Sequence, residues 1–335
     1  MPGTRRAMLA TAAAIGLDLG LGLGPHGRAG AQPGSAPLRL LVGYPAGGGT
    51  DLVARALAER LGRVLGQPVV ADNRPGANTI IATQAALAAP ADGATLLQAG
   101  SATLVVNPLL YRRLPYDADR DLVTLAISNG VPLVVVVNPS LPAATLAELT
   151  ALARARAAGP EGPVPFASNG LGNPTHLAAE MYAAQAGLRL THVPFQGSSR
   201  ALVSVLAGDT PLMVDTIGSA LPYIRDGRLR ALAVTTPQRL AVLPQVPTVA
   251  EQGFPGFDAS FWYGIAVSVR VPPATRQRLH AALAEAMADA GFNTLLANLG
   301  LAPEPPRSLA ELASFVTADR ARWAGVIRAS GITLE

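Results

Sequence analysis

The 335-residue sequence contains no cysteine and no lysine, and each absence excludes a class of chemistry. Without cysteine there is no disulfide, no thiolate nucleophile, no cysteine-bound metal and no lipid-modified cysteine anchor. All 26 basic residues are therefore arginines. A Schiff-base lysine and the lysine of a nucleotide-binding P-loop are excluded as well.

Charged and aromatic residues are scarce, at 14% and 4%, whereas half of all residues are hydrophobic. This composition is typical of a compact globule packed with alanine, leucine and valine, and the length is sufficient for two domains. The formal charge of +4 is small and spread along the chain. We therefore expect no nucleic-acid partner.

Residues 1–31 have the pattern of a signal peptide. Arg5 and Arg6 precede an apolar stretch, and small residues that end at Ala31 offer a cleavage site. We predict a periplasmic protein that is cleaved near Ala31, exported by either the twin-arginine or the general pathway. The alternative, a membrane anchor, is disfavoured by Asp18 and by repeated glycines within the stretch. No later stretch approaches 18 uninterrupted apolar residues, so we expect the mature protein to be soluble.

The glycine-rich stretch Tyr44–Asp51 separates a predicted strand at 38–43 from a predicted helix that ends at Leu65. Three successive glycines allow the backbone to approach a ligand closely. The first amides of a helix lack internal partners and carry the positive end of its dipole, which suits a carboxylate or phosphate. The alternative interpretation is a tight turn capped by Thr50.

Short apolar runs alternate with helical patterns along the chain, which predicts an α/β fold with mostly parallel sheets. Pro-rich segments at 138–142 and 243–257 indicate two crossings between lobes. We predict one lobe of residues 36–138 plus 255–335 and a second of residues 139–254, with the ligand between them.

Helix starts are also marked in the sequence. Thr145, Thr248 and Ser308 each stand three residues before a glutamate, which is the pattern of a capping box. Asn173 precedes a proline and predicts another helix start.

Catalytic and metal-binding motifs are not apparent. The sequence has no G-x-S-x-G and no H-E-x-x-H pattern, and its four histidines show no metal-ligand spacing. We predict no metal and no cofactor. His176, in a first helical turn, either donates a hydrogen bond to a ligand or only packs. Asp215, at the end of an apolar strand, either accepts from a ligand amine or caps its loop.

Polar residues follow several predicted strands, at Ser101, at 168–175 and at 196–199. With Tyr44–Asp51 they describe a pocket that is rich in neutral donors and has no evident nucleophile. Binding without turnover is therefore the better inference.

The mature chain resembles the Bug-type, TctC-like periplasmic receptors of tripartite tricarboxylate transporters. The motifs that carry the resemblance are Tyr44–Asp51, Asn73–Ala77, Pro90–Leu97, His192–Gly197, Leu229–Thr235 and Leu243–Gly256. The resemblance implies a two-lobed type II periplasmic binding protein fold, in which sheets flanked by helices are joined by a two-strand hinge. It also implies that the first loop holds one carboxylate of an organic acid and that loops of the second lobe hold its other end.

From these loops and the resemblance together we predict a ligand-binding site. Its residues are Tyr44, Ala46, Gly47, Gly48, Gly49, Thr50, Asp51, Asn78, Ser101, Ser168, Asn169, Gly170, Thr175, His176, Gln196, Gly197, Ser198, Asp215 and Thr216.

The expected ligand is a small organic acid or amino acid. The expected partners are the membrane subunits of the transporter, or a sensor kinase, and we expect the chain itself to be a monomer. Two alternatives stay open at this point. One is a secreted hydrolase or isomerase that uses His176 and Asp215, and the other is a purely sensory role.

The chain departs from the family pattern at three places. Gly49 stands where the family usually has proline, Asn78-Thr79-Ile80 replaces Gly-Gly-Asn, and Thr216 stands where asparagine is frequent. The last two changes alter donors that the resemblance places near the cleft.

Overall fold

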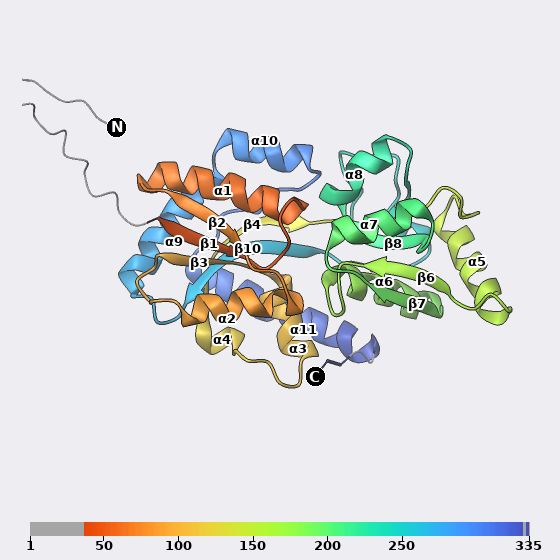
Figure 1. The fold of residues 1–335 in the computed structure, drawn as a ribbon, viewed down its shortest axis with the longest axis horizontal. Coiled ribbons are helices and arrows are strands. Elements are labelled where there is room, and N and C mark those ends of the chain that lie inside the picture. The colour runs from red at the N-terminus through yellow and green to blue at the C-terminus, as the bar shows by residue number, and fades with distance from the viewer. Residues whose placement is uncertain (1–36, 331–332, 335) are drawn as a thin grey trace, which may run out of the picture. The chain divides into compact units, whose positions relative to one another are not determined.

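The computed structural model describes residues 37–330, 333 and 334. The predicted signal peptide lies outside them. The described residues contain two five-stranded sheets, in strand order β2-β1-β3-β10-β4 and β7-β6-β8-β5-β9 (Figure 1). The strands of the first sheet are β1 (Leu38–Val42), β2 (Val69–Asn73), β3 (Thr95–Gly100), β4 (Leu122–Val131) and β10 (Phe261–Ser268). Those of the second are β5 (Leu133–Val137), β6 (Val164–Ser168), β7 (Leu190–Pro194), β8 (Leu212–Thr216) and β9 (Arg230–Val234).

Each sheet is mixed, with two parallel and two antiparallel pairings, and four of its five strands run in the same direction, in keeping with the predicted mostly parallel sheets. β1 pairs in parallel with β2 and β3, and β6 pairs in parallel with β7 and β8. One strand in each sheet, β10 or β5, runs antiparallel to both of its neighbours. The carboxyl ends of the parallel strands therefore meet at one edge of each sheet, where α/β folds bind ligands.

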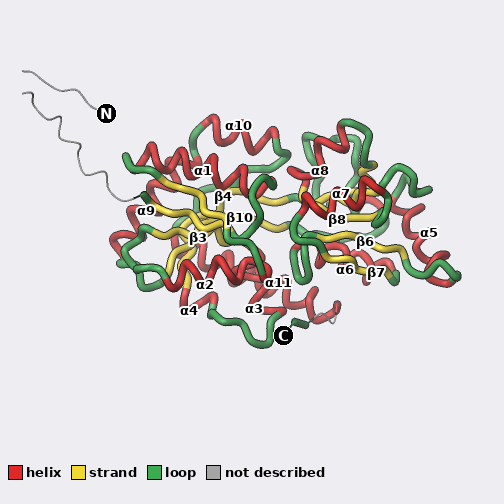
Figure 2. Tube along the Cα trace, viewed as in Figure 1, coloured by secondary structure: helices red, strands yellow, loops and turns green. Residues whose placement is uncertain are grey.

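Helices cover both faces of both sheets (Figures 1 and 2). The longer helices are α1 (Gly49–Leu65), α2 (Ile80–Ala88), α5 (Leu146–Ala158), α6 (Pro174–Ala186), α7 (Ser198–Ala207), α8 (Ile217–Arg225), α9 (Pro273–Met287), α10 (Ala290–Asn298) and α11 (Leu309–Ser330). Shorter ones are α3 (Asn107–Leu110), α4 (Ala118–Asp121), η1 (Ala77–Thr79), η2 (Ala102–Val106) and η3 (Ala250–Gln252).

The core consists of two apolar clusters, one on each side of the sheets. One cluster joins buried residues of α2, α5, α6 and α11, and the other joins those of α1, α7, α8, α9 and α10. Strand β5 contributes alternately to both, with Val135 in the first cluster and Val134 in the second. Because both of its faces are covered, this strand is an unbroken apolar run.

The predicted helix starts are confirmed. The Thr145 hydroxyl accepts from the Glu148 amide at 3.1 Å, and Ser308 and Glu311 bond each other reciprocally. The box at Thr248 is also formed, but it opens only the three-residue helix η3.

The chain crosses between the sheets at Pro132, which links β4 to β5, and again through residues 235–260. The predicted first lobe included residues 133–137, yet β5 pairs with β8 and β9 of the second sheet. We therefore propose that the lobes divide at Pro132 and near residue 260, a few residues from the predicted boundaries.

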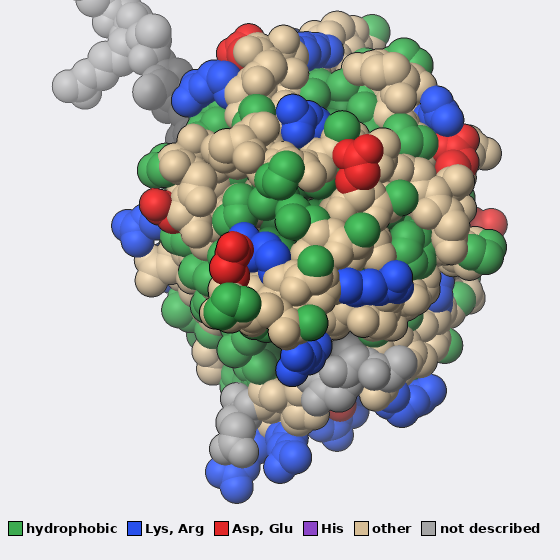
Figure 3. Space-filling view, turned by 90° about the vertical axis from the view of Figure 1, so that its right-hand side faces the viewer, with side chains coloured by type: hydrophobic (Ala, Val, Ile, Leu, Met, Phe, Trp, Pro, Cys, Tyr) green, Lys and Arg blue, Asp and Glu red, His purple; other side chains and the backbone are tan. Residues whose placement is uncertain are grey.

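Charges are dispersed on the side of the described molecule where α5 lies, which is the right-hand side of Figure 1. Basic and acidic side chains lie there among apolar and neutral ones (Figure 3).

Candidate functional site

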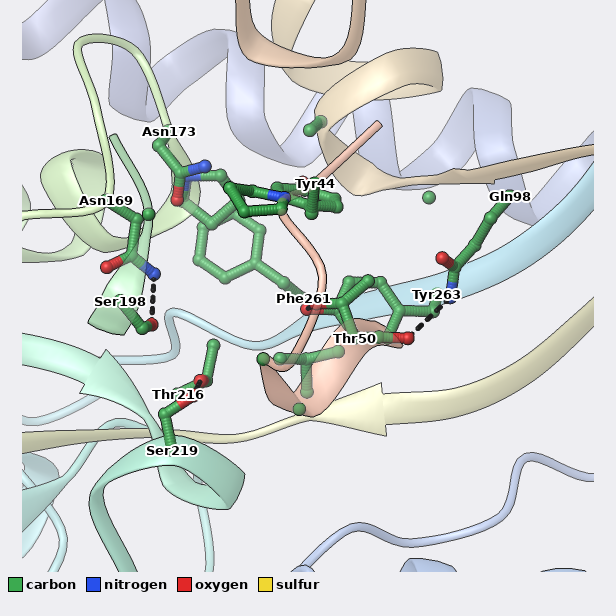
Figure 4. Close-up of a pocket in the computed structure, with 18 of the residues that line it drawn as sticks. Tyr44, Thr50, Gln98, Asn169, Asn173, Ser198, Thr216, Ser219, Phe261 and Tyr263 are labelled. Carbon is green, nitrogen blue, oxygen red and sulfur yellow. Dashed lines mark hydrogen bonds between the residues drawn. The ribbon is translucent and has the colours of Figure 1, made fainter. Parts of the chain in front are cut away.

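A cavity of about 180 Å³ lies between the two sheets, at the carboxyl ends of β1, β3, β6 and β8 (Figure 4). Its wall combines neutral polar side chains with aromatic rings. The polar members are Thr50, Gln98, Ser101, Thr103, Asn169, Asn173, Gln196, Ser198, Ser199, Thr216 and Ser219. The aromatic members are Tyr44, Phe261, Trp262 and Tyr263.

The first side of the cavity is the start of helix α1. The helix begins at Gly49 and has no side-chain cap. In the described part of the chain, the amides of Gly48, Gly49 and Thr50 donate to no backbone or side-chain acceptor. Such amides at the positive end of a helix attract an anion.

Asp51 holds this loop in place by hydrogen bonds. Its carboxylate accepts from the Gly47 amide, Arg55 Nε and Asn73 Nδ2, each at 2.9 Å. Gly47 has φ +83°, which favours glycine. Burial opposes ionisation of Asp51, but the bonds from Arg55, Gly47 and Asn73 outweigh it and lower the pKa of this carboxyl. Asp51 is therefore a charged support of the loop and does not line the cavity.

The Thr50 hydroxyl bonds to the Tyr263 hydroxyl. Because Gly48 stands at the N-cap of α1 and no side chain caps the helix, the alternative expectation that Thr50 caps this turn is wrong. Burial raises the pKa of Tyr263 to about 12 and raises that of Tyr44 further. Both phenols are neutral at ordinary pH, and their rings lie 6.2 Å apart.

The second side of the cavity is organised by Asp215, which is fully buried. Its Oδ1 accepts from Ser198 Oγ at 2.6 Å, from the Thr216 amide at 2.7 Å and from Asn169 Nδ2 at 3.3 Å. Asn169 Nδ2 also donates to Ser198 Oγ at 2.8 Å (Figure 4). Burial raises the pKa of Asp215 to about 6. Asn169 Oδ1 and Asp215 Oδ2 are buried without a partner among the described residues.

Eleven of the predicted site residues line this cavity. They are Tyr44, Ala46, Gly48, Gly49, Thr50, Ser101, Asn169, Gln196, Gly197, Ser198 and Thr216. The other eight do not: Gly47, Asp51, Asn78, Ser168, Gly170, Thr175, His176 and Asp215. Several of these eight residues hold lining residues in place, as Asp215 does with Ser198.

His176 packs inside the second lobe instead of facing the cavity. Its Nδ1 accepts from the Gly172 amide at 3.1 Å, and its ring stacks on His192 with centroids 3.8 Å apart. His192 Nε2 lies 2.6 Å from Ser168 Oγ, and burial lowers its pKa to about 4. His280 is half buried, and its Nδ1 lies 2.7 Å from the Leu125 carbonyl oxygen.

Sequence reasoning missed the residues that lie within strands. Gln98 is inside β3, and Phe261, Trp262 and Tyr263 open the antiparallel strand β10. No loop motif marks these positions. Arg200, near the start of α7, was also missed, although it immediately follows the predicted 196–199 loop.

The family model described as "Tripartite tricarboxylate transporter family receptor" matches residues 53–332. The chain belongs to this receptor family. It is 37% identical to Protein BugT of Bordetella pertussis over 89% of this chain and 90% of that protein.

Two solved structures share the fold over most of their lengths. Rpa4515 of R. palustris, solved with adipate, is 30% identical with a TM-score of 0.83, covering 89% of this chain and 98% of that one. The periplasmic binding protein BugD is 27% identical with a TM-score of 0.83, covering 89% and 99%. The two-lobed fold that the resemblance implied is thereby confirmed.

Members of this family are solute receptors and not enzymes. The hydrolase alternative also lacks geometric support, because neither His176 nor Asp215 reaches the cavity wall. Within residues 37–330, 333 and 334, no three histidine, aspartate or glutamate side chains are arranged to hold a metal ion. The helices in that part of the chain are all too short or too polar to span a membrane.

Proposed function

We propose that this protein is an exported receptor that binds a small organic carboxylate in the cavity and delivers it to the membrane subunits of a tripartite tricarboxylate transporter. The observation that carries the proposal is the set of amides of Gly48, Gly49 and Thr50, which belong to residues of the cavity wall and have no acceptor among the described residues. One carboxylate group fits these amides, because it accepts several hydrogen bonds and is stabilised by the helix dipole.

The rest of the wall suits reversible binding. Neutral hydroxyl and amide groups fix the orientation of a ligand, while Phe261 and Trp262 contact its carbon chain. No carboxylate side chain lines the cavity, so no described group there repels an anion. That a relative of similar fold was solved with adipate supports the same class of ligand.

Closure of the two lobes about the two crossings would bury the ligand, and the closed form would be the one that the membrane subunits recognise. Periplasmic location with cleavage near Ala31 is part of the proposal. It agrees with the family and with the signal-like segment at residues 1–31.

The test is a thermal-shift screen of the exported protein against organic acids, amino acids and amines without a carboxylate, followed by calorimetry on the hits. A ligand at 100 times its dissociation constant stabilises the fold by roughly 2.7 kcal/mol, which gives a visible shift. We expect carboxylates to bind and the amines not to bind. Tight binding of an uncharged or cationic solute, with no response to any acid, would contradict the proposal.

A further inference from the structure

Another cavity, of about 260 Å³, lies within the first lobe and shares no lining residue with the cavity between the sheets. It is bounded by β4, by α9 and by the segment that leads into α11. Strand β4 is the outermost strand of the first sheet, and both helices pack against it. We call this space the β4 cavity. The receptor function proposed above makes no use of it.

The wall of the β4 cavity is apolar apart from three side chains. The apolar residues come from the strand, from both helices and from the segment before α11. The three polar residues are His280, Arg307 and Ser308. No aspartate or glutamate of the described chain lines the cavity. A ligand that fits this wall therefore combines an apolar body with a group that a cation attracts.

Arg307 is held beside the cavity by contacts on its other sides. Its Nη2 donates to Glu304 Oε2 at 2.9 Å, and its guanidinium carbon lies 4.6 Å from the centre of the Phe315 ring. Its Nη1 is buried and has no acceptor among the described residues. A buried donor on a charged group costs free energy when it lacks an acceptor. Arg307 is therefore a fixed cation with an unused hydrogen-bond donor.

His280 is oriented by a break in the register of β4. The ladder between β4 and β10 passes from Ala126 to Thr124, so Leu125 has no partner residue in β10. The Leu125 carbonyl oxygen instead lies 2.7 Å from His280 Nδ1. Because a carbonyl oxygen only accepts, Nδ1 carries the hydrogen and Nε2 is the free nitrogen of this ring.

The start of α11 reinforces the preference for an anion. Ser308, which lines the cavity, directly precedes this helix of 22 residues, and the positive end of its dipole lies there. The two nearest carboxylates already have partners, since Glu304 pairs with Arg307 and Glu311 bonds to Ser308. Neither of them lines the cavity.

We propose that the β4 cavity is a second binding site, for an apolar monocarboxylate. The carboxylate accepts from Arg307, whose planar guanidinium matches its geometry, and the dipole of α11 favours the same charge. The carbon chain lies against the apolar wall, where burial of its surface contributes to the affinity. This site lies apart from the one in the proposed function, and neither depends on the other.

The test is a nuclear magnetic resonance titration of protein with isotope-labelled methionine methyl groups and histidine rings. Met287 and His280 line the β4 cavity and do not line the cavity between the sheets. Their signals therefore report binding at this site separately from binding in the cleft. Met181 and Met213, which lie in α6 and β8 of the second lobe, serve as internal references.

The probes are four small molecules that separate charge from chain length. Hexanoate, hexanol and hexylamine have the same chain with a negative, neutral and positive end, and acetate has the charge without the chain. We expect hexanoate to shift the signals of Met287 and His280 in a saturable manner. Hexanol, hexylamine and acetate should each bind at least about tenfold more weakly, because each lacks the charge or the apolar surface.

The variants separate the cation from the cavity. Arg307→Gln should weaken hexanoate about tenfold and hexanol less than about twofold, and Arg307→Lys should keep part of the hexanoate affinity. Arg307→Gln also removes the ion pair with Glu304, so Ala284→Leu gives an independent check. It narrows the cavity from α9, leaves Arg307 in place and should weaken hexanoate and hexanol together. Arg278→Gln, an exposed change on α9 outside the cavity wall, should match the wild type.

Three results would overturn the proposal. The first is a wild-type protein in which hexanoate gives no saturable shift at Met287 and His280 together, because a ligand that fills the cavity contacts both. The second is equal affinity for hexanoate and hexanol. The third is wild-type affinity for hexanoate in Ala284→Leu, which would place the ligand elsewhere. None of these results bears on the receptor function of the cleft.

Discussion

Asp215 is a buried carboxyl group whose ionisation opposes folding. Burial raises its pKa to about 6, from an ordinary value of 3.8. Between these two pH values the folded protein binds more protons at this group than the unfolded chain does. The contribution of Asp215 to the free energy of unfolding is therefore full below about pH 4 and is lost as the pH rises to about 6.

We predict that Asp215→Asn is more stable than the wild type above pH 6, by on the order of 2 kcal/mol. The amide keeps the Oδ1 acceptor for Ser198 and for the Thr216 amide but removes the charge. The gain should shrink as the pH falls from about 6 to about 4, below which the carboxyl of the wild type is protonated in both states. Urea unfolding across this range measures it, and a difference that does not vary with pH would contradict the prediction.

Gly49 supplies an amide that a proline at the same position could not. A side chain is tolerated there, since an added Cβ would lie 3.8 Å from Ser219 Oγ. The preceding Gly48, at φ −84° and ψ 169°, is compatible with a following proline. Gly49→Ala and Gly49→Pro therefore differ mainly in whether the N–H group is present.

We predict that Gly49→Ala binds the carboxylate ligand with nearly wild-type affinity, whereas Gly49→Pro binds about tenfold more weakly, the loss expected for one hydrogen bond to a charged group. Both variants should unfold at an equal or higher denaturant concentration, because each restricts the unfolded chain. Calorimetry and chemical denaturation measure the two effects. Identical affinities for the two variants would show that this amide is not used.

At the scale of elements, the sequence best predicts those strands whose local residue pattern agrees with their place in the sheet. Strand β5 is a five-residue run of leucine and valine with both faces covered, and its apolar pattern marks it plainly in the sequence. Strand β4 has no such mark, because Ser128, Asn129 and Gly130 interrupt its apolar character. Its ladder with β10 joins residues that are 130 or more positions apart, and a local sequence pattern contains no information on such pairing.

The candidate site shows the same difference between features set by local pattern and features set by long-range pairing. Loops after parallel strands were predictable, because parallel topology brings them to one edge. The Tyr263 hydroxyl bond to Thr50 was not, since it depends on the register between distant strands. His176 was placed correctly in the first turn of α6, but which way the ring faces depends on its stacking with His192.

Helix α11 supports a residue of the cavity wall. The helix begins with a capping box at Ser308, whose contribution to stability can be tested alone. Its Asp319 accepts from Trp262 Nε1 at 2.8 Å, and Trp262 lines the cavity. We predict that Ser308→Ala lowers the free energy of unfolding by about 1 kcal/mol. Thr317→Ala, an exposed substitution within the helix, should cost nothing because alanine is the better helix former. Chemical denaturation compares the two, and equal stabilities would contradict a role for the cap.

At the scale of the whole described molecule, Asn78 joins the two lobes at a strained segment. Ala77, Asn78 and Thr79 all have positive φ, at 42°, 46° and 76°, which is unfavourable for residues other than glycine. Asn78 Nδ2 donates to Asn107 Oδ1 at 2.7 Å in its own lobe and to the Gly172 carbonyl at 3.0 Å in the other. Strain of this kind persists where surrounding contacts hold it, and here those contacts cross between lobes.

We predict that Asn78→Gly releases the bound carboxylate about five- to tenfold faster than the wild type, because the ligand-bound protein loses a hydrogen bond between its lobes worth about 1 kcal/mol. Ala77→Gly is the matched control. Glycine accepts either backbone conformation and adds similar freedom to the unfolded chain, but only the first substitution removes the contact with Gly172. Dissociation rates from stopped-flow displacement distinguish the variants. If both glycine variants release the ligand at the same rate, the hydrogen bond from Asn78 does not hold the lobes together, and closure depends on the ligand and the two chain crossings alone.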